Sequence, residues 1–443
     1  MDNQTIYALS TVQGRSGVAV IRISGPMALD TVKFLTNINP QTIKPRYAYF
    51  SPLHNSSGEV LDHALVLYFK APHSFTGEDI VELQTHGSKA VISSVLSALS
   101  SLKGFRYASA GEFSKRAFLN HKMDLTQAEG LADLIDAETS EQQKFAIRQI
   151  EGNLKNLYES WREQLLKVLA HLEAYIDFPD EELPPELINN LENTVFKIIS
   201  AIEYHLSGNN IGESMRDGFR VVILGAPNAG KSSLINALTS RDAVIVSDIA
   251  GTTRDAIDIH MDINGYPVIF TDTAGLRETG EEIERQGIAI AYRKASDSDL
   301  VINLFDGCEN IHQPLENIDK TKIISVANKA DKLSPQTISY LNSQGIITIS
   351  AKYKQGLDTL LSAISDNIKQ RVTDNSGLLI TRHRYTEALK NTINHLKQFN
   401  LSKEIELAAE DIRLSARELG KITGFIEVDE ILNKIFSSFC IGK

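Results

Sequence analysis

Residues 220–232 read Arg-Val-Val-Ile-Leu-Gly-Ala-Pro-Asn-Ala-Gly-Lys-Ser, and they determine the architecture of the middle of the chain. The first five are typical of a buried strand, Gly225–Ser232 fits the pattern GxxxxGKS, and Ser233–Leu238 is a predicted helix. In this context glycines let backbone N–H groups surround phosphates at a helix N-terminus, while Lys231 neutralises charge and Ser232 offers a hydroxyl to Mg²⁺. We therefore predict a phosphate-binding loop, formed by Asn228, Ala229, Gly230, Lys231, Ser232 and Ser233.

Three further motifs follow in order, each at the carboxyl end of a predicted strand, which argues against an accidental glycine-rich turn. Asp272-Thr-Ala-Gly275 would place a carboxylate near the metal and an amide near the γ-phosphate. Asn328-Lys-Ala-Asp331 ends in an aspartate that can accept two hydrogen bonds from guanine, which adenine cannot donate. Ser350-Ala-Lys352 resembles the loop whose backbone contacts the guanine oxygen. Together they predict a GTP site that includes Asp272, Thr273, Ala274, Gly275, Asn328, Lys329, Asp331, Ser350, Ala351 and Lys352.

Hydrophobic periodicity divides the chain around this site. Residues 1–120 carry short strand signals and read as an α/β domain, and residues 216–377 alternate strand and helix signals. Residues 121–215 and 378–443 carry helical spacing, and neither part could easily bury its apolar face alone. The predicted fold class is therefore α/β and α, with a Ras-like P-loop G domain inserted into a helical domain. Residues 207–218 and 372–377 read as the two linkers, because they are polar and carry glycine.

Composition limits the class of protein further. The chain has 443 residues, 42% of them hydrophobic and 23% charged, which suits about three soluble domains. Two distant cysteines, no leader-like N-terminus and no apolar run of membrane-spanning length predict a cytoplasmic protein. The net charge of −11 counts against binding nucleic acid unaided, although a local patch or a basic partner could compensate.

GTP hydrolysis requires a group that positions the attacking water. In a Ras-like enzyme this group is a glutamine directly after the DxxG motif. Leu276 holds that position here and cannot orient water, and no arginine finger is evident. The segment Ser247-Asp-Ile-Ala-Gly-Thr-Thr-Arg-Asp255, with Asn228, resembles the potassium-activated GTPases of the TrmE-Era-EngA class. That resemblance implies a K⁺ ion in place of the finger, and Thr253 as the switch threonine on Mg²⁺. The implied K⁺ ligands are Asn228, Ser247, Ile249 and Thr252.

The same resemblance adds nucleotide contacts and a catalytic residue. The contacts it implies are Ser247, Asp248, Ile249, Ala250, Gly251, Thr252 and Thr253. The family usually has threonine where this chain has Ser247, a change that a backbone ligand tolerates. Glu284 matches the glutamate that positions the water in this class. From the residues alone, Glu281, Glu282 and Glu284 also fit a solvated acidic start of a helix.

Motifs at both ends of the chain resemble the MnmE (TrmE) family of tRNA-modifying GTPases, over almost the whole length. They are Gly14-Arg-Ser-Gly17, Ile21-Arg-Ile-Ser-Gly25, Ser74-Phe-Thr-Gly-Glu-Asp79, the segment Gly111–Asn120, and the terminal Phe439-Cys-Ile-Gly-Lys443. The resemblance implies that the N-terminal α/β domain is folate-binding-like and dimerises. It implies tetrahydrofolate contacts at Arg22, Glu82, Lys122 and Lys443. Without the family, Arg22 and Lys122 would be interpreted as members of structural ion pairs.

The two cysteines receive different interpretations. Cys440 lies between apolar residues and fits either a small buried side chain or, by the resemblance, a thiol near the folate one-carbon unit. Cys308 is predicted to be part of the core.

The implied function is the GTP-hydrolysing part of a tRNA modification complex. A homodimer of this chain would join the flavoprotein MnmG (GidA), which alone would carry FAD, in a heterotetramer that also contacts the tRNA. The complex would add an aminomethyl or carboxymethylaminomethyl group to C5 of the wobble uridine, with 5,10-methylene-tetrahydrofolate as carbon donor. Two alternatives are a ribosome-assembly GTPase like Era or EngA, and a dynamin-like mechanical scaffold. The residues after 380 carry no GxxG with basic flanks, which argues against the former, and neither explains the terminal motif.

Overall fold

The computed structural model describes residues 4–177, 184–240, 258–271, 292–309, 315, 318–374, 379–402, 404–424, 435–437, 439 and 442. The chain forms two compact units, each built from segments distant in sequence. Unit 1 comprises Met1–Ala132, Lys155–Ser160 and Leu419–Lys443, and unit 2 comprises Asp133–Leu154 and Trp161–Glu418. The end of the chain therefore belongs to the same unit as its beginning.

Unit 1 is built on a six-stranded sheet of order β3-β4-β5-β2-β1-β6. Its strands pair antiparallel except for β1 and β6, which are parallel. The strands are β1 (Thr5–Leu9), β2 (Ser16–Ser24), β3 (Ala48–His54), β4 (Val60–Phe69), β5 (Ile80–Gly87) and β6 (Phe105–Tyr107). The helices are α1 (Asp30–Leu35), α2 (Lys89–Ser100), α3 (Glu112–Leu119) and α4 (Leu125–Asp136).

The two faces of this sheet are covered unequally. On one face, alternate residues of the strands join α1 and α2 in a core that includes Ile21, Val66 and Leu83. On the other face, α3 covers β1 with the fully buried ring of Phe113. The opposite face of β3, β4 and β5 leaves Phe50 72% exposed. This uncovered face of the sheet is a candidate functional surface of unit 1.

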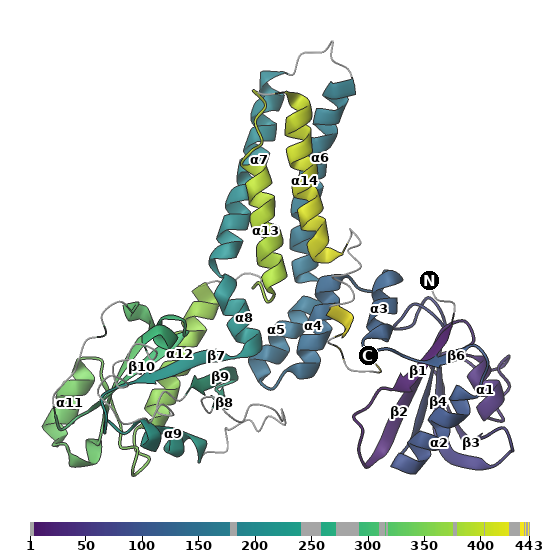
Figure 1. Ribbon diagram of the computed structural model, residues 1–443, viewed down its shortest axis with the longest axis horizontal. Helices are drawn as coiled ribbons and strands as arrows, with labels where there is room; N and C mark the ends of the chain where they lie inside the picture. Colours follow the sequence, from purple (N-terminus) through teal and green to yellow (C-terminus); the bar gives the residue numbers. More distant parts are fainter. Residues whose placement is uncertain are drawn as a thin grey trace, which may run out of the picture. The chain divides into compact units, whose positions relative to one another are not determined.

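Unit 2 contains a helical part and an α/β part. The helical part contains α5 (Ser140–Ile150), α6 (Asn153–Asp177), α7 (Pro185–Ser207), α13 (His383–Leu396) and α14 (Ile405–Thr423). Of these, α6, α7, α13 and α14 run side by side (Figure 1). Lys397 pairs with Glu203 at 2.7 Å just beyond α13, and Arg413 of α14 pairs with Glu173 of α6. These segments lie more than 190 residues apart in sequence. The helices before and after the α/β part therefore form one bundle.

The α/β part has a six-stranded sheet of order β12-β11-β10-β7-β9-β8, parallel except for β8. The strands are β7 (Phe219–Leu224), β8 (Asp258–Ile263), β9 (Tyr266–Thr271), β10 (Leu300–Asp306), β11 (Ile323–Asn328) and β12 (Ile347–Thr348). The helices are α9 (Lys231–Thr239), α11 (Pro335–Ser343), α12 (Leu357–Asp374) and two 3-10 turns, Lys320–Lys322 and Ala330–Lys332. The predicted parallel sheet with crossover helices is confirmed, with an antiparallel edge strand that the sequence analysis did not anticipate.

Two sequence predictions about helices are wrong in detail. The predicted linker 207–218 contains helix α8 (Asn209–Asp217), because tertiary contacts stabilise a segment of poor helical composition. A Cβ on its Gly212 would lie 2.1 Å from the carbonyl oxygen of Ile380, so glycine permits this packing. The predicted linker 372–377 likewise begins inside α12, which extends to Asp374.

Within the predicted helical part 121–215, residues 125–177 form three helices, α4, α5 and α6. A capping box between Thr139 and Gln142 starts α5, and Gly152 adopts a left-handed conformation before α6.

Candidate functional site

The predicted phosphate loop lies between the end of β7 and the start of α9, and two of its glycines are required by packing. A Cβ on Gly225 would lie 2.1 Å from the Leu304 oxygen, and one on Gly230 would lie 2.2 Å from Asn328 Nδ2. Gly230 and Asn228 both adopt positive φ angles, 99° and 69°. The loop is therefore pressed against its neighbours and held in one tight turn.

The polar groups expected to bind phosphate and Mg²⁺ lie together at the N-terminus of α9. Ser232 and Ser233 are exposed in the first turn of the helix, where backbone N–H groups lack helical partners. Lys231 Nζ donates to the carbonyl oxygens of Gly225 at 2.6 Å and Ala226 at 3.1 Å, which holds its charge over the loop. This arrangement fits a bound triphosphate with a Mg²⁺ ion on the Ser232 hydroxyl.

Asn328 connects three loops of the predicted nucleotide site. Its side chain is buried, donates to the Ala229 oxygen at 2.8 Å and accepts from the Ala351 N–H at 3.1 Å. The first contact joins residues 99 positions apart. Asn328, predicted only as part of the guanine motif, thus locks the phosphate loop to the loop that follows β12.

The predicted guanine-binding residues also gather at the ends of β11 and β12. Ser350 Oγ donates to Asp331 Oδ1 at 2.5 Å, and within the described part of the chain this is the hydrogen bond that Asp331 accepts. Lys329, with φ of 63°, forms an ion pair with Asp306 at 2.5 Å. Asp331 therefore retains acceptor capacity for the guanine N–H donors.

Asp306 was not identified from the sequence, although it ends β10 at the same edge of the sheet. Burial raises the pKa of its carboxyl, but the hydrogen bond from Lys329 outweighs that effect and holds the pKa below its usual value. The hydrogen bond to Asp306 raises the pKa of Lys329 in turn. The pair fixes the left-handed turn at Lys329 that leads into Asp331. Lys352 is exposed beside the ring of Tyr353, at 5.0 Å from its centroid.

In unit 1 the predicted folate residues Arg22 and Glu82 face each other across β2 and β5. Arg22 Nε donates to Glu82 Oε1 at 2.9 Å, with side chains 22% and 16% exposed. The guanidinium also lies 5.2 Å from the ring centroid of Phe75 and 5.7 Å from that of Phe113. The structural ion pair that the residues alone suggested for Arg22 is therefore present. Lys122 is exposed and pairs its backbone N–H with the Ala117 oxygen at 2.8 Å.

The remaining predicted residues lie outside the described residues, and their assignments stay predictions. They are Ser247, Asp248, Ile249, Ala250, Gly251, Thr252, Thr253, Asp272, Thr273, Ala274, Gly275, Glu284, Cys440 and Lys443.

Comparison with known proteins shows which family this chain belongs to. The model of the MnmE helical domain matches residues 125–440, and that of the GTP-binding protein TrmE N-terminus matches residues 5–122. The tRNA modification GTPase MnmE of Rickettsia bellii (strain RML369-C) is 45% identical over 99% of this chain and 100% of its own. The chain belongs to the MnmE family of tRNA modification GTPases.

A second relative, the tRNA modification GTPase MnmE of Paramagnetospirillum magneticum, is 46% identical over the full length of both chains. Among solved structures, Era in complex with MgGDPNP and a 16S ribosomal RNA fragment covers 34% of this chain and 56% of its own. That similarity has 29% identity and a TM-score of 0.26.

Family membership confirms the main sequence interpretation and its fold class. The protein is a GTPase of tRNA modification, with a P-loop domain, a helical domain and an N-terminal α/β domain. It favours this interpretation over the ribosome-assembly alternative. Every helix described is too short or too polar to cross a membrane. No cluster of three or more His, Cys, Asp or Glu side chains suited to a metal ion occurs among the described residues.

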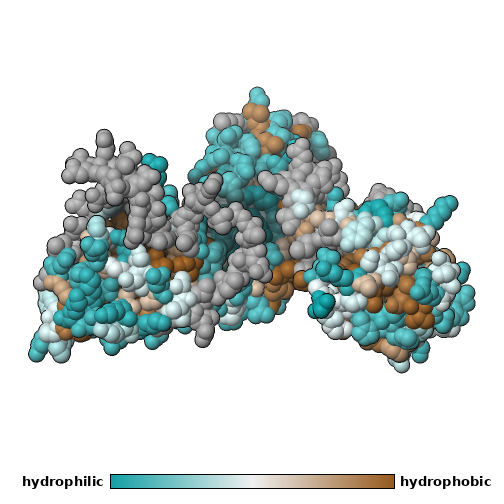
Figure 2. Space-filling model, turned by 60° about the horizontal axis from the view of Figure 1, so that its bottom comes forward, coloured by the Kyte–Doolittle hydropathy of each residue, from teal (hydrophilic) through white to brown (hydrophobic). Residues whose placement is uncertain are grey.

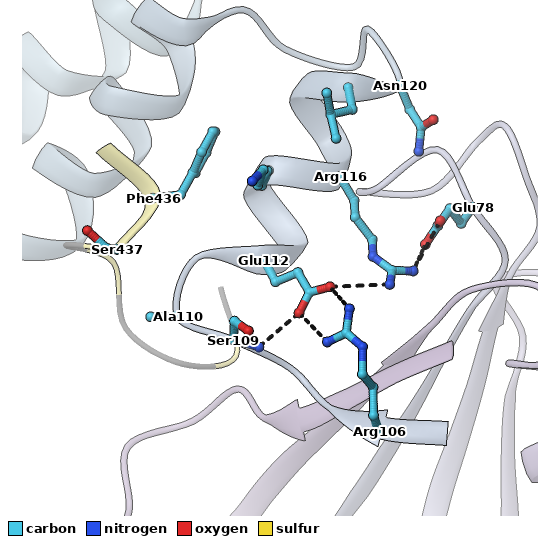
Figure 3. Close-up of a pocket in the computed structure, with 11 residues that line it drawn as sticks. Glu78, Arg106, Ser109, Ala110, Glu112, Arg116, Asn120, Phe436 and Ser437 are labelled. Atoms are coloured by element: carbon cyan, nitrogen blue, oxygen red, sulfur yellow. Dashed lines mark hydrogen bonds and ion pairs between the residues drawn. The ribbon is translucent and has the colours of Figure 1, made fainter. Parts of the chain in front are cut away.

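A cavity of about 690 Å³ lies beside α3 in unit 1 and was not foreseen from the sequence (Figure 3). A chain of ion pairs forms one wall: Glu78 pairs with Arg116 at 3.0 Å, Arg116 with Glu112 at 3.3 Å, and Glu112 with Arg106 at 2.5 Å. Phe436, near the C-terminus, lies across from this wall. The paired residues come from β6, α3 and the loop before β5, whose proximity no local sequence pattern reveals.

The ion pairs change the acidity of Glu112. Burial raises the pKa of its carboxyl, but hydrogen bonds from Arg106 and from the Ser109 N–H outweigh that effect, and the pKa lies below its usual value. Glu112 is therefore charged throughout the neutral range.

The prediction that Cys308 belongs to the core is wrong. Cys308 is exposed, because it lies two residues past the end of β10 in a turn where its N–H donates to Asp306 Oδ1 at 3.0 Å. Cysteine is most often a small buried side chain, but the end of β10 at Asp306 places Cys308 in an exposed turn.

Proposed function

We propose that this GTPase acts in adding an aminomethyl or carboxymethylaminomethyl group to C5 of the tRNA wobble uridine. In this proposal the carbon comes from 5,10-methylene-tetrahydrofolate bound in unit 1, and the flavoprotein MnmG (GidA) holds the FAD. The observation that carries the proposal is the Arg22–Glu82 pair, since the family resemblance implies folate contacts at both residues and they meet on one sheet face.

The chemistry of this pair suits a pterin. Only Arg22 hydrogen-bonds Glu82 among the described residues, so Glu82 Oε2 can accept from the adjacent N–H donors of a pterin ring. Phe75, already against the Arg22 guanidinium, offers apolar surface beside it. Lys122 and Lys443 would neutralise the glutamate tail of folate. When bound, the folate supplies the one-carbon unit, and these residues bind and orient it.

In unit 2 we infer that K⁺ and Mg²⁺ accompany GTP. The Mg²⁺ would rest on Ser232 and Thr253, and the K⁺ on Asn228, Ser247, Ile249 and Thr252. The positive φ of Asn228 and its exposed side chain support this, because the amide oxygen is accessible at the phosphate loop. The K⁺ supplies the positive charge that an arginine finger would supply, and Glu284 orients the water. Hydrolysis in KCl should be faster than in NaCl of equal strength; equal rates would contradict the potassium assignment.

The proposed assembly is a homodimer bound to MnmG. The uncovered face of the unit 1 sheet supports a homodimer through this unit, since Phe50 and Leu65 stand opposite each other on it, 72% and 39% exposed. Figure 2, where this unit is the body at the right, shows brown apolar patches on its surface. The net charge of −11 suggests that the partner supplies much of the tRNA contact.

The proposal is tested by analysing tRNA nucleosides from cells that lack this protein. We expect the C5-substituted wobble uridines to disappear and to return with the wild-type chain. Complementation with Glu82→Gln should fail, while Glu59→Gln, a charge change in the exposed turn between β3 and β4, should restore them. An unchanged nucleoside profile in the deleted strain would refute the proposed function.

A further inference from the structure

The C-terminal tail, which the structure describes at residues 435–437, 439 and 442, contacts the start of α3 at Gly111. Gly111, which precedes α3, has φ of 63°, and a Cβ placed on it would lie 2.3 Å from the Phe436 carbonyl oxygen. The same Cβ would lie 2.9 Å from Cδ2 of Phe439. Any side chain at position 111 would therefore push the tail away, in addition to straining its own backbone.

The tail has a second backbone contact near its end, at the end of β1. Gly442 is buried with φ of 96°, and a Cβ on it would lie 2.1 Å from the Leu9 carbonyl oxygen. Ser10 Oγ donates to the Gly442 carbonyl oxygen at 3.0 Å. The next-to-last residue of the chain is thus wedged against the first strand.

The tail is also anchored by the apolar ring of Phe436, which packs against the helices. Phe436 is 2% exposed and packs against Phe118 at 6.3 Å and Phe439 at 5.5 Å between ring centroids. It shares a cluster with Leu125 at the start of α4. The anchor fixes the tail's place in unit 1, and the two glycines set how closely its backbone approaches.

We propose that Gly111, Gly442 and Ser10 are positioning residues that clamp the C-terminal tail onto unit 1. The clamp sets how closely the tail backbone approaches β1 and α3, because neither glycine carries a side chain that would hold the tail away. Its catalytic consequence rests on the proposed folate chemistry, in which Lys443 binds folate and Cys440 is a candidate thiol. The clamp itself does not depend on that chemistry.

Removal of Lys443 by a basic-residue carboxypeptidase tests the clamp in the full-length protein. The protease must reach the Gly442–Lys443 bond, whose carbonyl accepts the Ser10 hydrogen bond, so cleavage requires the tail to open. We expect Gly442→Ala and Gly111→Ala to accelerate removal by roughly tenfold or more, and Ser10→Ala by about two- to tenfold. Intact-mass spectrometry over time measures the rate.

Gly58→Ala is the matched control, because Gly58 has φ of 83° but no atom within 4 Å of the added Cβ. It introduces the same backbone strain in unit 1 without touching the tail, and its cleavage rate should equal that of the wild type. Ser10→Ala, which adds no atoms, keeps the test valid if a glycine variant misfolds. Wild-type rates in Gly442→Ala and Ser10→Ala would overturn the clamp.

Nucleoside analysis of the same variants separates the clamp from the proposed function. Fast cleavage together with lost wobble modification supports both the clamp and its catalytic role. Fast cleavage with full modification keeps the clamp and removes the tail from the chemistry.

Discussion

The two candidate sites of this molecule are held together by different forces. In unit 2, the loops around the nucleotide site are joined above all by the neutral side-chain amide of Asn328, which bridges the Ala229 and Ala351 backbones, beside one ion pair, Lys329–Asp306. In unit 1, the surroundings of the folate residues are held by carboxylate–guanidinium pairs, of which Arg116 forms two. Neutral contacts keep their strength over a wide pH range, whereas charged ones depend on protonation.

The difference also concerns what happens when one partner is removed. A buried ion pair that loses one member leaves an uncompensated charge, which costs more than a lost neutral hydrogen bond. Removing one partner of an exposed ion pair costs little, because water screens the charge that remains. The strength of each framework can therefore be measured by single substitutions matched for exposure.

The largest effect is expected for Arg116→Ala in unit 1. Arg116 has a side chain 9% exposed and donates to Glu78, Glu112 and the Gln4 carbonyl oxygen. Its loss should lower the free energy of opening of β1 and β2 by about 3–5 kcal/mol, because Glu78 loses its ion-pair partner and Glu112 loses one of two. Hydrogen exchange resolved by peptide measures this for unit 1 alone.

Arg413→Ala makes the same chemical change on a side chain 52% exposed, where Glu173 and Glu410 are its partners. It should cost less than about 1 kcal/mol. Equal costs for the two arginines would mean that burial does not distinguish these ion pairs.

In unit 2 the largest effect should fall on turnover rather than on stability. Glu284→Ala should reduce kcat for GTP hydrolysis by about 10²–10³-fold with GTP affinity retained, since the glutamate is predicted to act on the water. Glu281→Ala and Glu282→Ala, acidic neighbours in the same segment, should leave kcat within about twofold. If all three variants behave alike, Glu284 belongs to a solvated acidic segment and has no catalytic role.

Local sequence patterns predicted what is contiguous in the chain. The phosphate loop follows from one eight-residue motif, and the strand before it and the helix after it are observed as β7 and α9. β1, β3 and β6 were not anticipated, since Thr5–Leu9 and Phe105–Tyr107 are too short for a clear alternation and Pro52 interrupts the third. Short strands are recognised by their neighbours, which a single segment does not reveal.

Contacts between segments that lie far apart in the sequence could not be predicted from it. The register of β2 against β5 brings Arg22 to Glu82, and no spacing along the chain indicates that pairing. Asn328 meets Ala229 across 99 residues for the same reason. The exposure of Cys308 depended on where β10 ends, and strand ends are the least readable feature of an apolar run.

A smaller loss is expected when the neutral framework of the nucleotide site is cut. Asn328→Ala removes two hydrogen bonds and leaves the Ala229 carbonyl and the Ala351 N–H without this partner. The opening free energy of β11 should fall by about 3 kcal/mol, and GTP affinity should fall with it. Asn342→Ala, an exposed amide in the same domain, should change both by less than about 0.5 kcal/mol. Unchanged GTP affinity in Asn328→Ala would show that the loops are held by other contacts.

The smallest expected effect is on the pH dependence of stability, which differs between the helical bundle of unit 2 and the sheet of unit 1. Burial lowers the pKa of His205 to about 4 from 6.5, beside the ring of Trp161 at 5.7 Å. In the unfolded chain this histidine is protonated near pH 6.5, whereas in the folded chain it stays neutral until the pH approaches 4. The free energy of unfolding of the bundle is therefore unaffected by this histidine above pH 6.5 and falls as the pH drops from 6.5 towards 4. Between pH 7 and 5 the helices should lose about 2 kcal/mol. Glu112, whose pKa lies below its usual value, affects unit 1 only below about pH 4.5, where its stabilisation is lost.

His205→Phe should therefore flatten the pH dependence of hydrogen exchange in α6 and α7 between pH 7 and 5. His171→Gln, at an exposed position of α6, should leave that dependence as in the wild type. A slope that persists in His205→Phe would assign the acid sensitivity of the bundle to its carboxylates. In that case both units would respond to acid through the same class of side chain, and the contrast between a neutral and a charged framework would hold only for the loops around the nucleotide.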